Sequence, residues 1–512
     1  MINFHASARD IFFLLFVSFP LSGSMAKTTA AELRDEIVDA ISGERIAARL
    51  YIKSESGSGN KGTAEQGPWF FARSASSDGS AVTYRAQRSA ESIEVHTTLS
   101  PDPFISDLSA GRYTLTAECG KEYQPAKVSV EIGEQPASVS LRLRRWIDTN
   151  ALGWYSGETH VHRQVKDLPN LMQAEHLNVA LPLTYWVTSS DTPPSQGDKN
   201  SPAIKPELIY VDATHVLYPM NTEYEILRVN GKRHTLGAIF AINHKSVFTK
   251  GVPPVAEIAR QTHEQGGLLE LDKHNWPWSM MLVPIMKVDL YELTNNHIWR
   301  APFFFRDFRT PPPAYIKVGQ DDRGVSERGW IDFTFKNYYA LLNCGFRLRP
   351  TAGTASGVHP VPLGFGRVYV HLPSGFSYAK WMEGLDEGRT FVTTGPMMAV
   401  TVADNPPGST LAATAPAEYR LSGWIRSGAP LTTIEVVSEG EVIKTITPQN
   451  REMVSTGFES KADEAIHVAN STWLTVRCFE TTREGRVRFA HSSPTHIDMT
   501  GKPLRPRRAE VE

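Results

Sequence analysis

The middle third of this 512-residue chain alternates helix-like with strand-like segments, and this alternation constrains the fold more than any other feature. In residues 170–183 an amphipathic helical stretch runs into an apolar strand. Residues 255–272 and 335–355 repeat this order, with glycine between the helical and the strand-like part. Successive helix–strand units are typical of a parallel sheet or a βα barrel. We therefore expect an α/β domain over residues 148–397.

The two flanking thirds carry strand signals only. Their segments alternate apolar and polar residues between polar or glycine-containing joints, which is typical of β-sandwiches. We expect one sandwich over residues 27–147, a second over 398–500 and a disordered tail over 501–512. The first resembles the small transthyretin-like (carboxypeptidase-regulatory-like) sandwich, to which we assign no catalysis. The strand-like segments are 46–52, 81–86, 92–99, 112–118, 126–132, 137–146, 419–426, 432–447 and 472–481.

The N-terminus predicts export. A polar start with one arginine precedes the apolar run 11–21, and Ser24 and Ala26 have the spacing that a signal peptidase reads. We expect residues 1–26 to be a cleaved signal peptide and the mature protein to be periplasmic or secreted. The apolar run is short for a membrane span, and no later segment approaches 18 apolar residues. No integral membrane span is therefore expected.

Composition narrows the partners. The formal net charge is −2, and no basic block occurs beyond residues 505–508, which argues against nucleic acid and leaves a small molecule as the expected partner. Three cysteines, Cys119, Cys344 and Cys478, lie far apart in the chain. They fit neither a disulfide framework nor a zinc ribbon, so we interpret them as buried core thiols.

Eleven of the sixteen histidines lie between His160 and His371, so histidine-based chemistry belongs to the middle region. His160 and His162 close the strand-like segment 153–163, GWYSGETHVHR. Because residues i and i+2 of a strand face the same side, this pair can offer two imidazoles to one ion. Other polar residues lie at or near the ends of predicted strands, where α/β folds gather their chemistry; most follow a strand, whereas His234 opens one and Glu292 lies on one. They are Glu223, Glu225, His234, Asp272, Lys273, His274, Asn275, Glu292, Asn295, Asn296, His297, Ser356 and His359.

In this order, the motifs of the middle region resemble the polymerase-and-histidinol-phosphatase (PHP) metallohydrolase superfamily, in particular its carbaryl-hydrolase-like CehA/McbA branch. The resemblance covers about residues 146–396 and implies a distorted βα barrel with a metal cluster at its C-terminal mouth. It is carried by GWYSGETHVHR, NTEYEI with RHTLGAIF downstream, LLELDKHNWPW, VDLYELTNNHIWR, TAGTASGVHP, GRVYV and EGRTFVTTGP.

The resemblance also implies a set of metal ligands, with Glu225 as a rival to Glu223. Two departures reduce the expected number of ions. Residues 183–190, LTYWVTSS, replace the family's Thr-Asp-His-Asn, and the Asp of its Asp-x-His motif has no counterpart in GTASGVH. We therefore expect one or two divalent ions, zinc first and manganese or iron as alternatives. The expected ligands are His160, His162, Glu223, His234, His274 and His359.

The implied activity is that of an exported metal-dependent hydrolase. A divalent ion lowers the pKa of bound water towards about 7, and the resulting hydroxide attacks an ester, amide, carbamate or phosphoester. Lys273 or Arg163 would polarise the acceptor oxygen, and Asp272 or Glu225 would carry the proton.

Two other interpretations remain open. A serine hydrolase would use Ser356 with His359, although the chain lacks the Gly-x-Ser-x-Gly motif. A non-catalytic binding protein would keep a degenerate metal site and stack Trp276 and Trp278 on a ligand such as a glycan.

Overall fold

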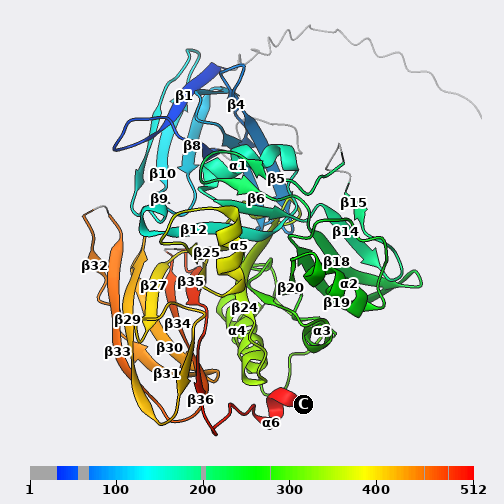
Figure 1. Cartoon of the computed structure of the whole chain (residues 1–512). Coiled ribbons are helices and arrows are strands. Elements are labelled where there is room, and N and C mark those ends of the chain that lie inside the picture. Colours follow the sequence, from blue (N-terminus) through cyan, green and yellow to red (C-terminus); the bar gives the residue numbers. More distant parts are fainter. Residues whose placement is uncertain are drawn as a thin grey trace, which may run out of the picture.

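The computed structural model describes residues 31–512 except 56–67, 198–202, 277, 309, 455 and 483. It is a mixed α/β structure, rich in strand and built on several sheets (Figure 1). The predicted signal peptide, residues 1–26, lies outside the described residues.

The N-terminal region consists of two sheets that enclose one apolar core. One has the strand order β4-β7-β1-β11-β9, and the other contains β10, β8, β2, β6 and β5, with β3 added on β2. Leu33 and Leu141 of the first sheet share a buried cluster with Leu50 and Leu115 of the second. The strands are β1 Ala31–Asp39, β2 Ala48–Ser54, β3 Trp69–Phe70, β4 Arg73–Ser74, β5 Ala81–Gln87, β6 Ile93–Leu99, β7 Phe104–Leu108, β8 Gly111–Glu118, β9 Tyr123–Gln124, β10 Ala126–Ile132 and β11 Ser140–Arg145.

The three predicted helix–strand units of the middle region are confirmed. Helix α1 (Leu168–Glu175) leads into β13 (Val179–Pro182), and α2 (Val255–Glu264) leads into β20 (Leu268–Asp272). Helix α4 (Glu327–Asn343) leads into β24 (Arg349–Ser356). The other helices here are α3 Ser279–Met286, α5 Tyr378–Asp386 and the short η1 Asn150–Leu152 and η2 Val165–Asp167.

One continuous run of strands holds the middle region together. From β14, hydrogen-bonded pairs lead through β18, β19, β20, β21 and β24 to β12, and on to β13 and β17. Most of these pairs are parallel, but β18–β19 and β19–β20 are antiparallel. Across the described residues the pairings do not show a closed barrel. The remaining bounds are β12 Trp154–Val161, β14 Tyr185–Ser189, β15 Ser195–Gln196, β16 Ile209–Tyr210, β17 Val216–Leu217, β18 Thr222–Val229, β19 Lys232–Ile242, β21 Leu290–Thr294, β22 Gln320–Asp321, β23 Gly324–Val325, β25 Arg367–His371 and β26 Thr390–Thr393.

The C-terminal region continues the middle sheet, because β26 pairs antiparallel with β35. A separate four-stranded sheet, β27-β29-β33-β32, covers it over a second apolar core. The tail differs from its prediction: it ends in helix α6, where Glu510 accepts a hydrogen bond from Asn343 of α4 at 3.0 Å. The bounds are β27 Met397–Val402, β28 Thr410–Ala413, β29 Ala417–Ser427, β30 Leu431–Ser438, β31 Glu441–Ile446, β32 Arg451–Glu452, β33 Phe458–Val468, β34 Thr472–Thr481, β35 Val487–Ser492, β36 Thr495–Met499 and α6 Arg508–Val511.

The described part of the chain contains no helix that is both long and apolar enough to cross a membrane. The three cysteines are free thiols; Cys119 and Cys478 are buried, whereas Cys344 is partly exposed.

Candidate metal centre

A cavity of about 670 Å³ opens beside the ends of strands β12, β20, β21 and β24. Its wall includes His160, which is on β12, and His162, which follows that strand directly. Glu223 and Glu225 of β18 also belong to the wall. Lys273 follows β20 and also lines the cavity. His160, His162 and Lys273 meet because parallel strands deliver their carboxyl ends to one edge of a sheet, whereas Glu223 and Glu225 lie in the first half of β18 and line the same cavity.

The His-x-His spacing brings its two imidazoles together, with ring centroids 5.2 Å apart. Glu223 is the register partner of Trp186 of β14, whose ring centroid lies 5.4 Å from that of His162. Nε2 of His162 is 3.2 Å from Oε2 of Glu223. One ligand atom from each of His160, His162 and Glu223 lies within 4.8 Å of the others, which is close enough to share an ion.

A carboxyl group fixes the His160 ring from behind. Nδ1 of His160 lies 2.9 Å from Oε2 of Glu292, which is on β21. We assign the proton to Nδ1, so that the Glu292 oxygen accepts and Nε2 keeps its lone pair, as in carboxylate–histidine–metal arrangements. Burial lowers the pKa of His160 to about 3, so the ring is neutral at neutral pH. A second group of possible ligands, His160, Asp272 and Glu292, shares this histidine.

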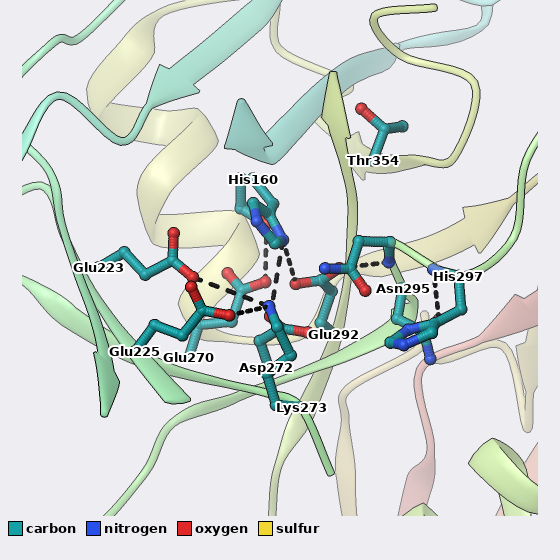
Figure 2. A network of polar contacts seen from close by, with 12 residues as sticks. His160, Glu223, Glu225, Glu270, Asp272, Lys273, Glu292, Asn295, His297 and Thr354 are labelled. Carbon is teal, nitrogen blue, oxygen red and sulfur yellow. Dashed lines mark hydrogen bonds and ion pairs between the residues drawn. The ribbon is translucent and has the colours of Figure 1, made fainter. Parts of the chain in front are cut away.

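Lys273 supplies the positive charge among the carboxyl groups beside His160 (Figure 2). Its ammonium contacts Asp272 and lies 3.7 Å from Oε1 of both Glu223 and Glu225. Burial alone would favour a neutral amine, but the three carboxylates hold the pKa of Lys273 above its usual value. Burial likewise opposes ionisation of Asp272 and Glu223, yet the ammonium, the neighbouring histidines and hydrogen bonds together outweigh it, and both pKa values lie below normal.

In three neighbouring carboxyl groups, Glu225, Glu270 and Glu292, burial outweighs the nearby positive charge, so their pKa values are raised. Burial, aided by Asp272 and Glu158, raises the pKa of Glu270 to about 8, against the hydrogen bonds from Thr159 and Thr351. Burial also raises the pKa of Glu292 well above its usual value. For Glu225, burial raises the pKa to about 7 in spite of Lys273. The site thus contains more buried carboxyl groups than positive charges to balance them, a condition that favours a bound cation.

Two expected ligands lie away from this centre. His234 is exposed near the turn between β18 and β19. Because these strands are antiparallel, the residue opposite Glu223 is Phe240, about 20 Å along the strand from His234. His274 belongs to neither group of possible metal ligands and does not line the cavity; its Nε2 is 3.0 Å from Nδ2 of Asn295. The structure therefore does not place either histidine with His160 and His162.

The last expected ligand, His359, lines the cavity but has a different partner. The Arg88 guanidinium lies 3.0 Å (Nη2) and 3.3 Å (Nε) from Nδ1 of His359. Arginine can only donate, so Nδ1 accepts and the proton of the neutral ring sits on Nε2. A metal ligand needs that lone pair, so His359 is not a ligand in this arrangement. Burial, aided by Arg88, holds the pKa of His359 well below its usual value, which keeps the ring neutral.

Arg163, which was expected to polarise the acceptor oxygen, contacts the N-terminal region instead. Its guanidinium stacks 4.0 Å from the ring of Tyr84, which belongs to the N-terminal region. Arg163 is not among the residues that line the cavity. The structure therefore gives Arg163 a role in joining two regions and leaves Lys273 as the cation at the centre.

Sequence reasoning gave no role to two residues of the cavity wall. His297 follows β21; its ring stacks on Trp330 with centroids 4.6 Å apart, and its Nδ1 has no partner among the described residues. Arg88 reaches the wall from the N-terminal region, and no local pattern marks it. His297 carried a signal, since it follows a predicted strand, whereas Arg88 could be found only from the tertiary contact.

The aromatic and serine alternatives can be placed as well. Trp276 lines the cavity, Trp278 is exposed outside it, and Trp299 is fully buried behind His359. Ser356 is fully buried, and within the described residues its hydroxyl makes no hydrogen bond to His359. This arrangement disfavours a serine nucleophile.

Comparisons with family models, with curated proteins and with solved structures find no match to this chain.

Proposed function

We propose that the protein is an exported metal-dependent hydrolase whose ion is held by His160, His162 and Glu223. One observation carries the proposal: the ligand atoms of these three side chains lie within 4.8 Å of one another at the wall of a cavity. Two neutral imidazoles and one carboxylate are the donor set of catalytic zinc sites, with manganese or iron as alternatives. The strand run from β14 to β17 supports the accompanying proposal of a PHP-like barrel between two sandwiches.

The surroundings of the three side chains fit an ion. Oδ1 of Asp272 and Oδ1 of Asn296 are buried acceptors that have no hydrogen-bond partner among the described residues. Such acceptors are costly unless an ion or an ordered water satisfies them. Because the Nδ1–H of His160 faces Glu292, we assign one ion to the Nε2 side and make Glu292 a positioning residue.

The residues of the chain divide the remaining work. A bound divalent ion would acidify a water ligand and so supply a nucleophile at neutral pH. Lys273 keeps the Glu223 carboxylate ionised and faces the cavity, where it can polarise an acceptor oxygen. Glu225 lines the cavity whereas Asp272 lies beneath Lys273, so Glu225 is the better placed of the two to exchange a proton with substrate.

Metal content tests this proposal. Protein purified from its native host should contain about one equivalent of metal and hydrolyse nitrophenyl acetate or nitrophenyl phosphate. His160→Ala combined with His162→Ala should lose both the metal and the hydrolysis, while a control with two exposed histidines replaced, His234→Ala and His467→Ala, should keep them. A wild-type protein without metal would favour the binding protein, with Trp276 as its stacking platform.

The two glutamates of β18 provide a finer test. Glu223→Gln keeps the shape of the side chain but removes its charge, and should lose metal. Glu225→Gln should retain metal and lose hydrolysis. If only Glu225→Gln loses metal, the ligand assignment is wrong by two residues along the strand.

Export is supported by the N-terminal pattern alone. Intact-mass measurement on protein recovered from the native host should place Lys27 at the N-terminus. A mature chain that still begins at Met1 would contradict this part of the proposal.

A further inference from the structure

The N-terminal region extends a turn to the wall of the cavity. Arg88 lies between β5 and β6 and lines the cavity together with residues of the middle region. The turn is fixed on both sides: the Tyr84 hydroxyl donates to the carbonyl oxygen of His359, and the Ser92 hydroxyl donates to that of Pro302 at 2.6 Å. Arg88 is thus held at the cavity although it belongs to a separate pair of sheets.

Arg88 and His359 together present hydrogen-bond donors and no acceptor. Nδ1 of His359 is used as the acceptor for Arg88, which leaves Nε2–H as a donor. The guanidinium has five N–H groups, and this contact leaves several of them free. A pair of donors from two regions of the chain suits a ligand atom that only accepts.

A second pair of arginines lines the same cavity. Arg228 of β18 and Arg233 of β19 are register partners in the antiparallel pair, so their side chains start from neighbouring positions on one face. Like charges placed directly opposite each other destabilise a sheet. Glu225 and Asp307 also line the cavity, but among the described residues no carboxylate lies within the 4.0 Å of an ion pair from Arg228, Arg233 or Arg88. An anion bound between the side chains of Arg228 and Arg233 would remove the repulsion between their charges.

We propose that the cavity contains an oxyanion subsite, formed by Arg88 and His359 with the Arg228–Arg233 pair, so that the substrate carries an anionic phosphate, sulfate or carboxylate group. That the bound anion belongs to a substrate rests on the proposed function, whereas anion binding at the subsite does not require the metal. Arginine forks match the geometry of such groups and bind them with two parallel hydrogen bonds. The N-terminal region then determines specificity, because it supplies Arg88 to the cavity.

Inorganic sulfate tests the subsite, because it is an oxyanion and a poor ligand for zinc. Calorimetric titration of the chelator-treated full chain at constant ionic strength should show saturable sulfate binding. Arg88→Gln should weaken it about tenfold or more, and Arg88→Lys should recover part of the loss. The matched control is Arg85→Gln, an exposed arginine three residues earlier that does not line the cavity. Its sulfate binding should equal that of the wild type.

The outcomes separate this inference from the hydrolase proposal. Sulfate binding that depends on Arg88 in a protein without metal or hydrolysis would support the subsite and reject the hydrolase. If the enzyme is active, Arg88→Gln should raise KM for nitrophenyl phosphate about tenfold, whereas Arg85→Gln should keep the wild-type KM. Absent sulfate binding in the wild type, unchanged binding in Arg88→Gln, or an equal loss in Arg85→Gln would each overturn the subsite.

Discussion

The two flanking regions have similar strand-rich sequences, but they meet the middle region in opposite ways. The N-terminal sheets share no strand pairing with the middle sheet in the described structure, yet they place Arg88 in the wall of the cavity. The C-terminal strands continue the middle sheet through β26 and β35, yet no described residue after His359 lines the cavity. We therefore expect the C-terminal region, which shares strand pairing with the middle region, to stabilise the fold. We expect the N-terminal region, which contributes a side chain to the cavity wall, to shape the site.

The largest effect expected from this comparison is on stability. Phe489 of β35 is fully buried and meets Phe335 of α4 edge to face at 5.0 Å. Phe489→Ala should lower the free energy of unfolding by about 3–5 kcal/mol, because it removes a large side chain from a core shared by two regions. Urea titration measures this, with Val442→Ala on the exposed strand β31 as control. A loss below about 1 kcal/mol would show that the C-terminal region does not stabilise the middle one.

The next largest effect concerns the pH dependence of stability, which we expect to arise in the middle region. Folding raises the pKa of Glu270 from 4.5 to about 8, so the folded state favours the protonated carboxyl group. Its contribution is fully present below about pH 4.5 and is lost as pH rises through about 8. The metal-free protein should lose on the order of a few kcal/mol between pH 5 and pH 9.

Glu270→Gln keeps the shape of the side chain and cannot ionise, so it should make this profile shallower in thermal unfolding, while Glu292 and Glu225, whose pKa values are also raised, keep part of the slope. Glu134→Gln, in the N-terminal region, replaces an exposed carboxylate as control. If Glu270→Gln leaves the slope unchanged, the buried carboxyl group does not set the pH dependence and the flanking regions must be searched for its origin.

A moderate effect is expected where Arg486 of the C-terminal region supports the cavity wall indirectly. Arg486 forms an ion pair with Glu327 at 2.6 Å and donates to the carbonyl oxygen of Trp299, the residue behind His359, at 2.9 Å. Arg486→Ala should cost about 1.5–3 kcal/mol of stability, because it leaves buried partners of a charged group unsatisfied. Sulfate affinity and KM should change little. A variant of normal stability with weakened sulfate binding would break the division between the two flanks.

The elements of the middle region could be predicted because their signals are local. Helical periodicity, a glycine and an apolar run identified α2 with β20 and α4 with β24. The contact of His160 with His162 followed from the two-residue period of a strand. The position of His234 did not follow, since a hairpin that turns β19 antiparallel to β18 carries it away from Glu223.

The rest of the site depends on contacts that no local pattern encodes. Whether His359 binds a metal or donates a proton depends on the partner of its Nδ1, and that partner is Arg88, 271 residues earlier. The Lys273 ammonium between three carboxylates depends in the same way on the meeting of β18 and β20. Sequence therefore identified the candidate ligands better than it identified their hydrogen-bond partners.

The smallest effect tests how firmly the N-terminal region holds the cavity wall. Tyr84→Phe keeps the ring on which Arg163 stacks but removes the hydroxyl that donates to His359 and accepts from the Gly357 amide at 3.0 Å. One neutral hydrogen-bonding group contributes about 1 kcal/mol, so unfolding should become easier by about that amount. Arg88 lies four residues after Tyr84, just beyond the end of β5. Loss of the Tyr84 hydrogen bonds should therefore make the position of Arg88 less fixed, and sulfate affinity should fall about threefold. Tyr210→Phe, on the exposed strand β16, is the matched control and should change neither quantity. A Tyr84→Phe variant that loses stability but binds sulfate like the wild type would show that Arg88 is held by its own contact with His359 alone.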